Sequence, residues 1–342
     1  MLEIMTNLKI YGNWMRSPSF AWLRMYKFMY LLCVTLLLLT GRPARADNNK
    51  HMTSVWTTAR APTYVRLFAA RPLLAVVLYD GETRHETIFE PNIANIIGLS
   101  AHWDTLGISL SVPAGGERST TTYGDSRSFD LRLQKYGERS ALEFYLQYYR
   151  GYYLWDLPDG CDRGDPCSLH PDLRVLHSGF NAHYVNNPDW SIQAAFGYTG
   201  HQKKSAGSLI LSADLNVMLL DDDKPLQPDM PIPLDGVQYI GGAIVPGYGH
   251  TWVRGSWFLT PIVRLGFGVI HANYSVQSGA SSPESEWLPS LKLGGRLSTG
   301  YAGKKWRTGL QAHLDLWGPI NDEGVGISSH NNYLEIFVVR HL

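Results

Sequence analysis

Residues 305–316 read Lys-Trp-Arg-Thr-Gly-Leu-Gln-Ala-His-Leu-Asp-Leu, and apolar and polar side chains alternate along this stretch. The even-numbered positions are apolar or uncharged, whereas Arg307, His313 and Asp315 stand at odd-numbered positions. Successive side chains of an extended chain point to opposite faces, so a sustained period of two residues indicates a β-strand. One face of this strand is therefore apolar, and the other carries full charges.

Segments with the same alternation recur along the chain after residue 47. We count thirteen candidates, and because bacterial membrane barrels normally have an even number of strands, we expect twelve, with fourteen as the alternative. The segment 73–82 is the weakest candidate, since Pro72 precedes it and acidic residues follow it. The candidates are 73–82, 92–103, 105–114, 126–137, 140–154, 173–186, 190–202, 206–221, 238–253, 257–274, 287–302, 305–317 and 332–342.

Three features favour a membrane barrel over a soluble sandwich. The segments are close to or above the ~10 residues that a tilted membrane strand needs. Their polar faces carry charges that a packed soluble core would exclude. Aromatic residues flank the apolar faces, as they do at membrane interfaces: Trp190 and Tyr198, Trp287 and Tyr301, and Tyr148 and Tyr152. Because backbone groups in hydrocarbon must all be paired, the sequence predicts an all-β, closed, antiparallel transmembrane β-barrel.

The composition agrees with this class. The chain has 342 residues and 44% hydrophobic residues, which is too little for a bundle of membrane helices. Its 30 basic and 30 acidic residues are unevenly distributed, because residues 1–46 hold six bases and one acid. The remainder is mildly acidic. This argues against a protein that binds nucleic acid without sequence preference, because such a protein needs a basic surface.

The N-terminus predicts export. Residues 28–39 (FMYLLCVTLLLL) form an apolar core behind Lys27, and Ala44-Arg45-Ala46 offers a cleavage site of small residues. This core is shorter than the roughly 20 residues that a membrane-spanning helix needs, although an uncleaved anchor is the alternative. We therefore expect a signal peptide over 1–46, with translation starting at Met1, Met15 or Met25.

Two further regions follow from this boundary. Residues 47–84 form an N-terminal periplasmic segment that could contribute a first strand, and residues 85–342 form the barrel. Short turns near Asp104, 138–139 and Asn187-Pro188 suggest the periplasmic side, which places the loop at 155–170 outside. The same strand count makes 222–237 periplasmic despite its length.

Cys161 and Cys167 lie in a polar stretch of the exported region. In an oxidising compartment such a pair predicts a loop disulfide. A metal pair is the alternative, but no second Cys or closely spaced His pair accompanies it. We find no motif for a cofactor or for catalytic metal binding.

Several blocks resemble one bacterial family. They are Phe89-Glu-Pro-Asn92, Tyr123-Gly-Asp-Ser-Arg-Ser-Phe-Asp130, Tyr145-Leu-Gln-Tyr-Tyr-Arg-Gly-Tyr-Tyr153, Pro171-Asp-Leu-Arg-Val175 and His201-Gln-Lys-Lys-Ser-Ala-Gly-Ser208. Their order is similar to the family catalogued as domain of unknown function 4421, over most of 85–275. The resemblance implies an exported, outer-membrane barrel in a bacterial cell and brings no established activity. Such barrels usually end in an aromatic residue, whereas this chain ends in Leu342, in phase with Leu334, Ile336 and Val338.

Projecting the alternation inward gives a lumen with charges of both signs. One interpretation is a paired polar network that stiffens the wall, and the other is a hydrated pore or solute site; a barrel of this size allows both. We therefore expect a structural or channel-like protein. The side chains expected to face the lumen are Asp130, Arg132, Glu143, His177, Asn181, His183, His201, Asp214, Arg264, Lys292, Arg296, Arg307, His313, Asp315 and Glu335.

The block 201–208 allows three interpretations. As an enzyme site, Ser205 or Ser208 would be a nucleophile with His201 or Lys204 as base, as in outer-membrane lipid hydrolases, although no G-x-S-x-G motif is present. As a binding site, Lys203 and Lys204 would contact an anionic group such as a lipopolysaccharide phosphate. As a structural element, the block is a tight turn.

Other roles for charged residues are also open at this level. Lys203 and Lys204 could form salt bridges to Asp172 or Asp214, and Arg150 is a further candidate for lipid contact. The partners expected are outer-membrane lipid or lipopolysaccharide, the barrel-assembly machinery and a small solute. Oligomeric state is not determined by the sequence.

Two blocks carry local expectations. Arg150-Gly-Tyr-Tyr153 lies where a strand leaves the membrane, so Tyr152 and Tyr153 are expected as interface anchors. Gly151 is expected to mark a β-bulge or a close approach. Phe89-Glu-Pro-Asn92 is expected as a turn before a strand, with Asn92 restarting the ladder.

Overall fold

The computed structural model describes residues 56–58, 63–80, 85–103, 105–116, 118–155, 168–197, 200–226, 234–276, 285–320 and 325–342. The chain forms two compact units, 1–51 and 52–342, and every described residue belongs to the second. The expected signal peptide and the Cys161–Cys167 pair lie outside the described residues. In those residues, no helix has the length and apolarity to cross a bilayer.

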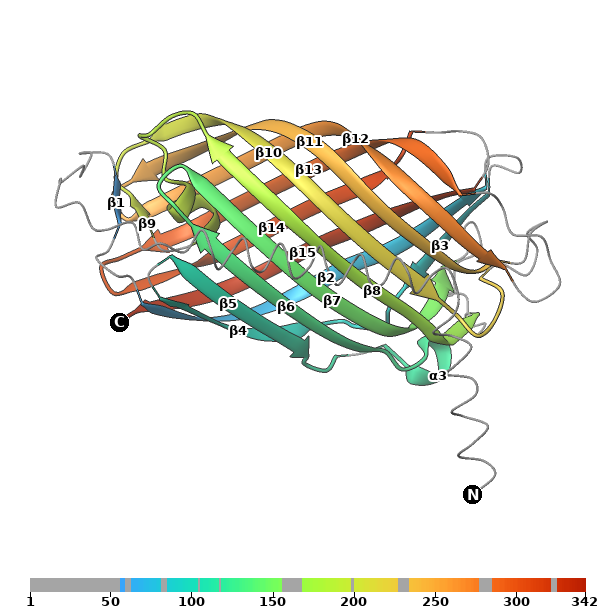
Figure 1. Ribbon diagram of the computed structural model, residues 1–342. Helices are drawn as coiled ribbons and strands as arrows, with labels where there is room; N and C mark the ends of the chain where they lie inside the picture. Colours follow the sequence, from blue (N-terminus) through green and yellow to red (C-terminus); the bar gives the residue numbers. More distant parts are fainter. Residues whose placement is uncertain are drawn as a thin grey trace, which may run out of the picture. The chain divides into compact units, whose positions relative to one another are not determined.

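Twelve strands close into an antiparallel ring (Figure 1). The last strand pairs with the first along its whole length, from Tyr64 opposite His341 to Asp80 opposite Val325. The expected closed, antiparallel barrel of about twelve strands is therefore confirmed. In ring order the strands are β2 (Tyr64–Asp80), β4 (Ile96–Trp103), β5 (Leu106–Pro113), β6 (Arg127–Tyr136), β7 (Ser140–Trp155), β8 (Leu169–Val185), β10 (Ala206–Asp221), β11 (Leu234–Arg254), β12 (Trp257–Val276), β13 (Glu286–Ala302), β14 (Trp306–Pro319) and β15 (Val325–His341).

One further strand, β3 (His85–Glu90), belongs to the wall at one end only. It pairs with residues 76–80 of β2 and with Tyr153–Trp155 of β7. At the opposite end, β4, β5 and β6 stand between β2 and β7. Between β2 and β7, the wall therefore contains only the short strand β3 at one end and the three strands β4, β5 and β6 at the other.

The strand predicted at 190–202 is wrong. After β8 the chain turns into the lumen, where it forms a π-helical turn (Gln193–Gly197) and the short strand β9 (Gly200–Gln202) paired with β1 (Trp56–Thr58). Trp190 and Ile192 are fully buried. They pack against inward-facing Val185, Ile210 and Ile262 rather than lipid.

The prediction failed because alternation shows that two faces differ but not what covers the apolar one. The weakest candidate, 73–82, proves to be the second half of β2. Without 190–202, the remaining twelve candidates correspond to the twelve strands of the ring.

This correction also changes the expected sidedness. Because 190–202 does not cross the barrel, β10 ends at Asp221 on the same end as the β7–β8 connection. The end of β10 therefore lies at the same end of the barrel as the end of β7 and the start of β8, and not opposite them as the strand count had suggested. The chain's C-terminus lies at the other end, close to β1 and β9 (Figure 1).

The outer surface is an apolar belt. Long side chains such as Leu209, Phe267 and Leu334 leave more than half of their surface exposed, which is expected only where lipid covers them. Trp257, Tyr301 and Trp306 stand outward at the strand ends nearest the C-terminus, and Trp287 stands outward at the other end.

The expected aromatic girdle is therefore confirmed for Trp287 and Tyr301, and Tyr148 also points outward. The prediction is wrong for Trp190 and Tyr152, because both side chains are buried in the interior of the barrel. Tyr198 is outside the described residues.

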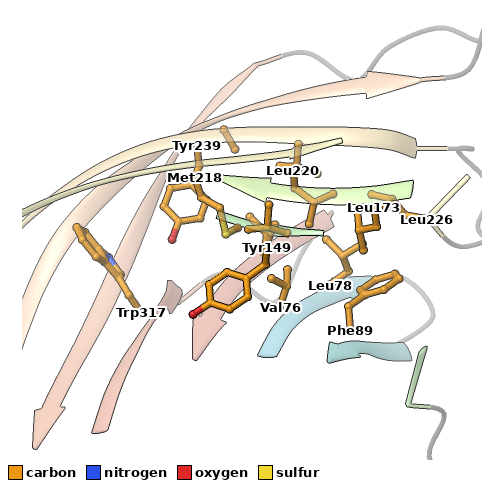
Figure 2. Packing of buried hydrophobic residues seen from close by; sticks show 14 of the residues in the cluster. Val76, Leu78, Phe89, Tyr149, Leu173, Met218, Leu220, Leu226, Tyr239 and Trp317 are labelled. Atoms are coloured by element: carbon orange, nitrogen blue, oxygen red, sulfur yellow. The ribbon is translucent and has the colours of Figure 1, made fainter. Parts of the chain in front are cut away.

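The interior is filled in three layers. Near β3 an apolar layer converges from several strands (Figure 2): Val76, Leu78, Phe89, Tyr149, Leu173, Met218, Leu220, Leu226, Tyr239 and Trp317. A charge layer, described below, occupies the middle. At the end near the C-terminus, the plug (residues 188–202, described at 188–197 and 200–202) occupies the lumen. On β10 this order is visible along one face, from Ile210 through Ser212 and Asp214 to Met218 and Leu220.

Candidate functional site: the charged lumen and its plug

The centre of the charge layer is an ion-pair cluster built by four strands. Lys292 of β13 is fully buried, with its Nζ 3.2 Å from both Asp214 Oδ2 and Asp315 Oδ1. Arg264 NH1 lies 3.7 Å from the same Asp214 oxygen. The ammonium of Lys292 also lies 4.4 Å from the Trp317 ring centroid. Removing such charges from water is costly, so each must be compensated by an opposite charge.

A second group of contacts joins β7 to distant strands. Arg296 NH2 of β13 lies 3.9 Å from Glu143 Oε2, and Asn331 Nδ2 of β15 donates to Gln147 Oε1 at 2.9 Å. Four strands separate β7 from β13 on the shorter way round the ring, and β3 and β2 stand between β7 and β15. These contacts therefore cross the lumen.

Two more pairs complete the layer. Arg132 binds Asp130 through two nitrogens, at 3.0 and 3.2 Å, and Arg66 forms an ion pair with Glu335. Within the described strands, the layer thus contains five basic and five acidic side chains, each with an opposite charge within 4 Å.

Sequence reasoning missed Arg66 because the segment 47–84 was set apart from the barrel. The signal was available, since Tyr64, Arg66 and Phe68 alternate with Val65 and Leu67.

The remaining residues that the sequence predicted to face the lumen are placed as follows. All except His201 lie on inward faces of barrel strands, and they come together in the charge layer or just beside it. His177, His183 and Asn181 are buried there, and His183 Nδ1 lies 2.8 Å from Ser212 Oγ. His201 belongs to β9, which is part of the plug and is not a strand of the barrel wall. Within the described ranges, no three His, Cys, Asp or Glu side chains gather as a metal site would require.

Arg307 holds the plug. Its NH2 donates to the Ala194 carbonyl at 2.9 Å and its NH1 to the Gly200 carbonyl at 3.4 Å, while the guanidinium lies 4.3 Å from the Phe258 ring centroid. The carbonyls of a short, irregular segment lack helical partners. The charged donor therefore satisfies backbone groups that would otherwise be buried unpaired.

The tip of the plug, Phe196, reaches the charge layer. Its carbonyl accepts the Tyr136 hydroxyl at 3.3 Å, and the Arg296 guanidinium lies 4.5 Å from its ring centroid. Near the start of the plug, the Trp190 indole donates to Thr251 Oγ1 of β11 at 3.0 Å. Gly249 lies beneath that indole, and a Cβ there would come within 2.7 Å of the ring.

The 201–208 block forms the return from the plug to β10. Ser205 Oγ accepts the Val253 amide at 2.9 Å, and Ser208 Oγ accepts the Asn187 amide at 2.9 Å. Gln202 ties the block to the plug, because its amide donates to the Asp189 and Lys204 carbonyls. Among the described residues, no hydrogen bond joins His201 to either serine.

The proposed salt bridges of this block are wrong. Asp172 instead accepts from Arg150 at 2.8 Å, and Asp214 is paired with Lys292 and Arg264. Arg150 lies on β7 near the β3 end, whereas Lys203 and Lys204 precede β10 at the other end. The three cations proposed for lipid contact therefore do not form one site.

Three of the sequence blocks meet at a second place, beside β3. Asn92 Nδ2 donates to the Arg118 and Gly124 carbonyls at 3.1 and 2.7 Å, and its backbone amide donates to Ser126 Oγ. Ser126 Oγ in turn donates to the Gly151 carbonyl at 2.7 Å. Asn92 thus fastens the β5–β6 connection, which includes α3 (Thr120–Tyr123), rather than restarting a ladder.

The neighbouring glycine and tyrosines complete this junction. Gly151, at φ +84°, lies at a register shift between β7 and β8, so the expected bulge is confirmed. Tyr152 and Tyr153 are buried, and the Tyr153 hydroxyl donates to Glu90 Oε2 at 2.6 Å. Their prediction as interface anchors is wrong. The bulge turns Tyr152 into the apolar layer of the interior, and Arg118 and Tyr123 of the β5–β6 connection cover Tyr153.

The comparisons with known proteins agree with the sequence blocks. The family described as Domain of unknown function (DUF4421) matches residues 58–331. The chain belongs to this family. Its matched region begins at β1 and ends within β15, so it includes nearly the whole ring, the plug and the β3 junction. No curated protein matches the chain.

Solved structures of similar architecture are distant from this DUF4421 chain. The outer-membrane protease OmpT from Escherichia coli is 11% identical, covering 85% of this chain and 99% of its own, with a TM-score of 0.36. The beta domain of the Bordetella autotransporter BrkA is 10% identical, covering 83% and 100%, also at 0.36. The COG4313 outer membrane channel from Pseudomonas putida F1 is 11% identical, covering 84% and 98%, at 0.33.

Proposed function

We propose that the protein is an outer-membrane β-barrel that is closed to solutes and acts as a rigid membrane-embedded structural element. The observation that carries this proposal is the pair of contacts across the lumen, Arg296 to Glu143 and Asn331 to Gln147. Opposite walls of an open pore are separated by water, whereas here their side chains are in contact. The network interpretation of the charged lumen is thereby favoured over the hydrated pore.

The layers on either side support the same proposal. The Tyr239 hydroxyl of β11 donates to Ser329 Oγ of β15 at 3.1 Å within the apolar layer, and the plug fills the lumen at the other end. A cavity of about 80 Å³ remains beside Arg132 and Tyr333 in the charge layer. Such a volume holds a few water molecules, which buried polar groups commonly retain.

In this proposal the C-terminal end of the barrel is periplasmic and the longer connections face outside, as is usual for outer-membrane barrels. The partners are then the lipids of the outer membrane and, during assembly, the barrel-assembly machinery. The outward row Leu334, Ile336 and Val338 on the closing strand supports such recognition.

The test is conductance of the purified protein in planar lipid bilayers. We expect no steady current at either polarity, because every layer of the lumen is occupied. A double variant, Gln147→Ala with Asn331→Ala, should remain silent as well, since the apolar layer and the plug persist. Steady ohmic current through the wild type would refute the closed barrel and support the channel interpretation.

A further inference from the structure

The barrel wall has a break beside β3. Residues 64–70 of β2 pair with β4, and residues 76–80 pair with β3. Between them, Arg71 to Ala75 pair only with β15, and no described strand lies along their other edge. Pro72 in this stretch has no N–H to donate, which suits an unpaired edge. In a membrane, the remaining backbone groups of such an edge need polar partners.

A cavity of about 250 Å³ lies at this break, next to the junction of β3. It is bounded by the unpaired stretch of β2, by the β3–β4 connection and by the outward face of β15. Its lining includes Arg71, Leu73, Ile93, Arg118, Tyr153 and Asn332. Leu73 is 55% exposed on the outer face of the barrel, so the cavity opens where the apolar belt is interrupted.

The charges of the lining favour an anion. Arg71 and Arg118 both contribute to it, and among the described residues neither has an acidic side chain within ion-pair distance. The acid of the lining, Glu90, accepts the Tyr153 hydroxyl at 2.6 Å. Arg118 NH1 donates to that hydroxyl at 3.3 Å, so Tyr153 stands between the acid and the guanidinium.

We propose that this cavity, the wall site, binds the anionic head of an amphiphile, a phosphate or carboxylate, between Arg71 and Arg118. Guanidinium groups bind such oxyanions through paired N–H donors, and more strongly where water is scarce. The unpaired edge of β2 and Asn332 supply further hydrogen bonds. The chain of the amphiphile lies along Leu73, where the site opens to the belt. This inference does not depend on the closed lumen.

The test uses the full chain, purified in a neutral detergent, and an alkyl phosphate probe that carries a photoactivatable diazirine on its chain. After irradiation, mass spectrometry maps the labelled peptides. We expect label at 71–75 and 91–94, and much less label from a probe with the same chain and a neutral glucoside head. Arg71→Gln with Arg118→Gln should lower the labelling at these peptides at least tenfold, because the head group then loses both of its charged hydrogen-bond donors.

The matched control is Arg340→Gln, an outward arginine at the other end of the same wall that lies over Trp306. It should leave the labelling unchanged. Arg71→Gln alone removes an exposed side chain, so it should reduce labelling without affecting folding, as judged by heat-dependent gel mobility.

Three outcomes would overturn the wall site. The first is equal labelling by the neutral probe, and the second is labelling of the double variant at the wild-type level. The third is complete competition by inorganic phosphate at the concentration of the probe, which would assign the site to a free ion.

Discussion

Lys292 of β13 and Asp214 of β10 form an ion pair with 3.2 Å between Nζ and Oδ2, although β11 and β12 stand between their strands in the wall. Both side chains are almost completely buried. The curvature of the closed ring brings together two residues that are 78 positions apart in the sequence. Contacts of this kind, rather than the ladder alone, set the shape of the lumen.

Removing Lys292 should destabilise the barrel strongly. Lys292→Met leaves Asp315 without its cation and Asp214 with Arg264 alone, and breaking a buried pair in this way costs about 3–5 kcal/mol. Urea unfolding in lipid vesicles measures this free energy. Adding Asp214→Asn should recover part of the loss, because the uncompensated charge is then gone.

The matched control for Lys292 is Lys305→Met, an exposed lysine in the β13–β14 turn. Its effect should stay within about 0.5 kcal/mol. Equal destabilisation by the two substitutions would mean that the buried cluster contributes nothing specific.

Arg307→Ala should release the plug without opening the barrel. The substitution removes two hydrogen bonds to plug carbonyls, so hydrogen exchange in the peptides of 189–197 should accelerate. The charge layer and the apolar layer remain, so planar bilayers should still show no steady current. Arg340→Ala, at the same end but facing outward, should leave the exchange unchanged. Unaltered plug exchange in Arg307→Ala would contradict the anchoring role.

Gly151→Ala should cost more than Gly255→Ala. Both glycines have positive φ, +84° and +62°, so an L side chain at either position is strained by about 1–2 kcal/mol. A Cβ at Gly151 would also collide with the carbonyl oxygen of Asp125, whereas the space beside Gly255 is open. Thermal unfolding should therefore give a clearly lower midpoint for Gly151→Ala. Identical midpoints would show that the β3 junction tolerates the bulk.

Docking of the plug should weaken in acid through His201. Burial, followed by the nearby charges of Arg307 and Lys203, lowers the pKa of His201 below its ordinary value of 6.5. The released plug then takes up a proton more readily than the docked plug, so docking is strongest above pH 6.5 and declines as the pH falls below it. Hydrogen exchange of the plug, corrected for intrinsic rates, should rise with acidity. His201→Gln should flatten this rise, and an unchanged pH profile would exclude His201 as its source.

The double variant Ser205→Ala with His201→Ala should give the same lipid A profile as the wild type. The Ser205 hydroxyl accepts the Val253 amide, and the structure shows no hydrogen bond to His201 among the described residues. A nucleophilic serine needs a base within hydrogen-bonding reach. Mass spectrometry of extracted lipid A compares cells that carry each form. A lipid species that disappears with the double variant would support the hydrolase interpretation.

Much of the wall could be predicted from the sequence, because each strand carries its own alternation. The inward positions of Asp214, Arg264 and Lys292 follow directly from that alternation. Their pairing does not, since period two places a residue on a face without saying which strand lies across the lumen. The same limit explains why the salt bridges predicted from Lys203 and Lys204 to Asp172 and Asp214 are wrong. In the structure these two acids pair with other cations.

By itself, the sequence determined which segments are extended and which of their faces is apolar, because these properties depend only on neighbouring residues. Tertiary structure alone decided that 190–202 is a plug, that Tyr152 turns into the interior and that charges cancel across the lumen. Each of these depends on ring closure, which brings distant residues into contact. An apolar side chain is stable against lipid or against a packed interior, and only the closed ring shows which of the two surrounds it.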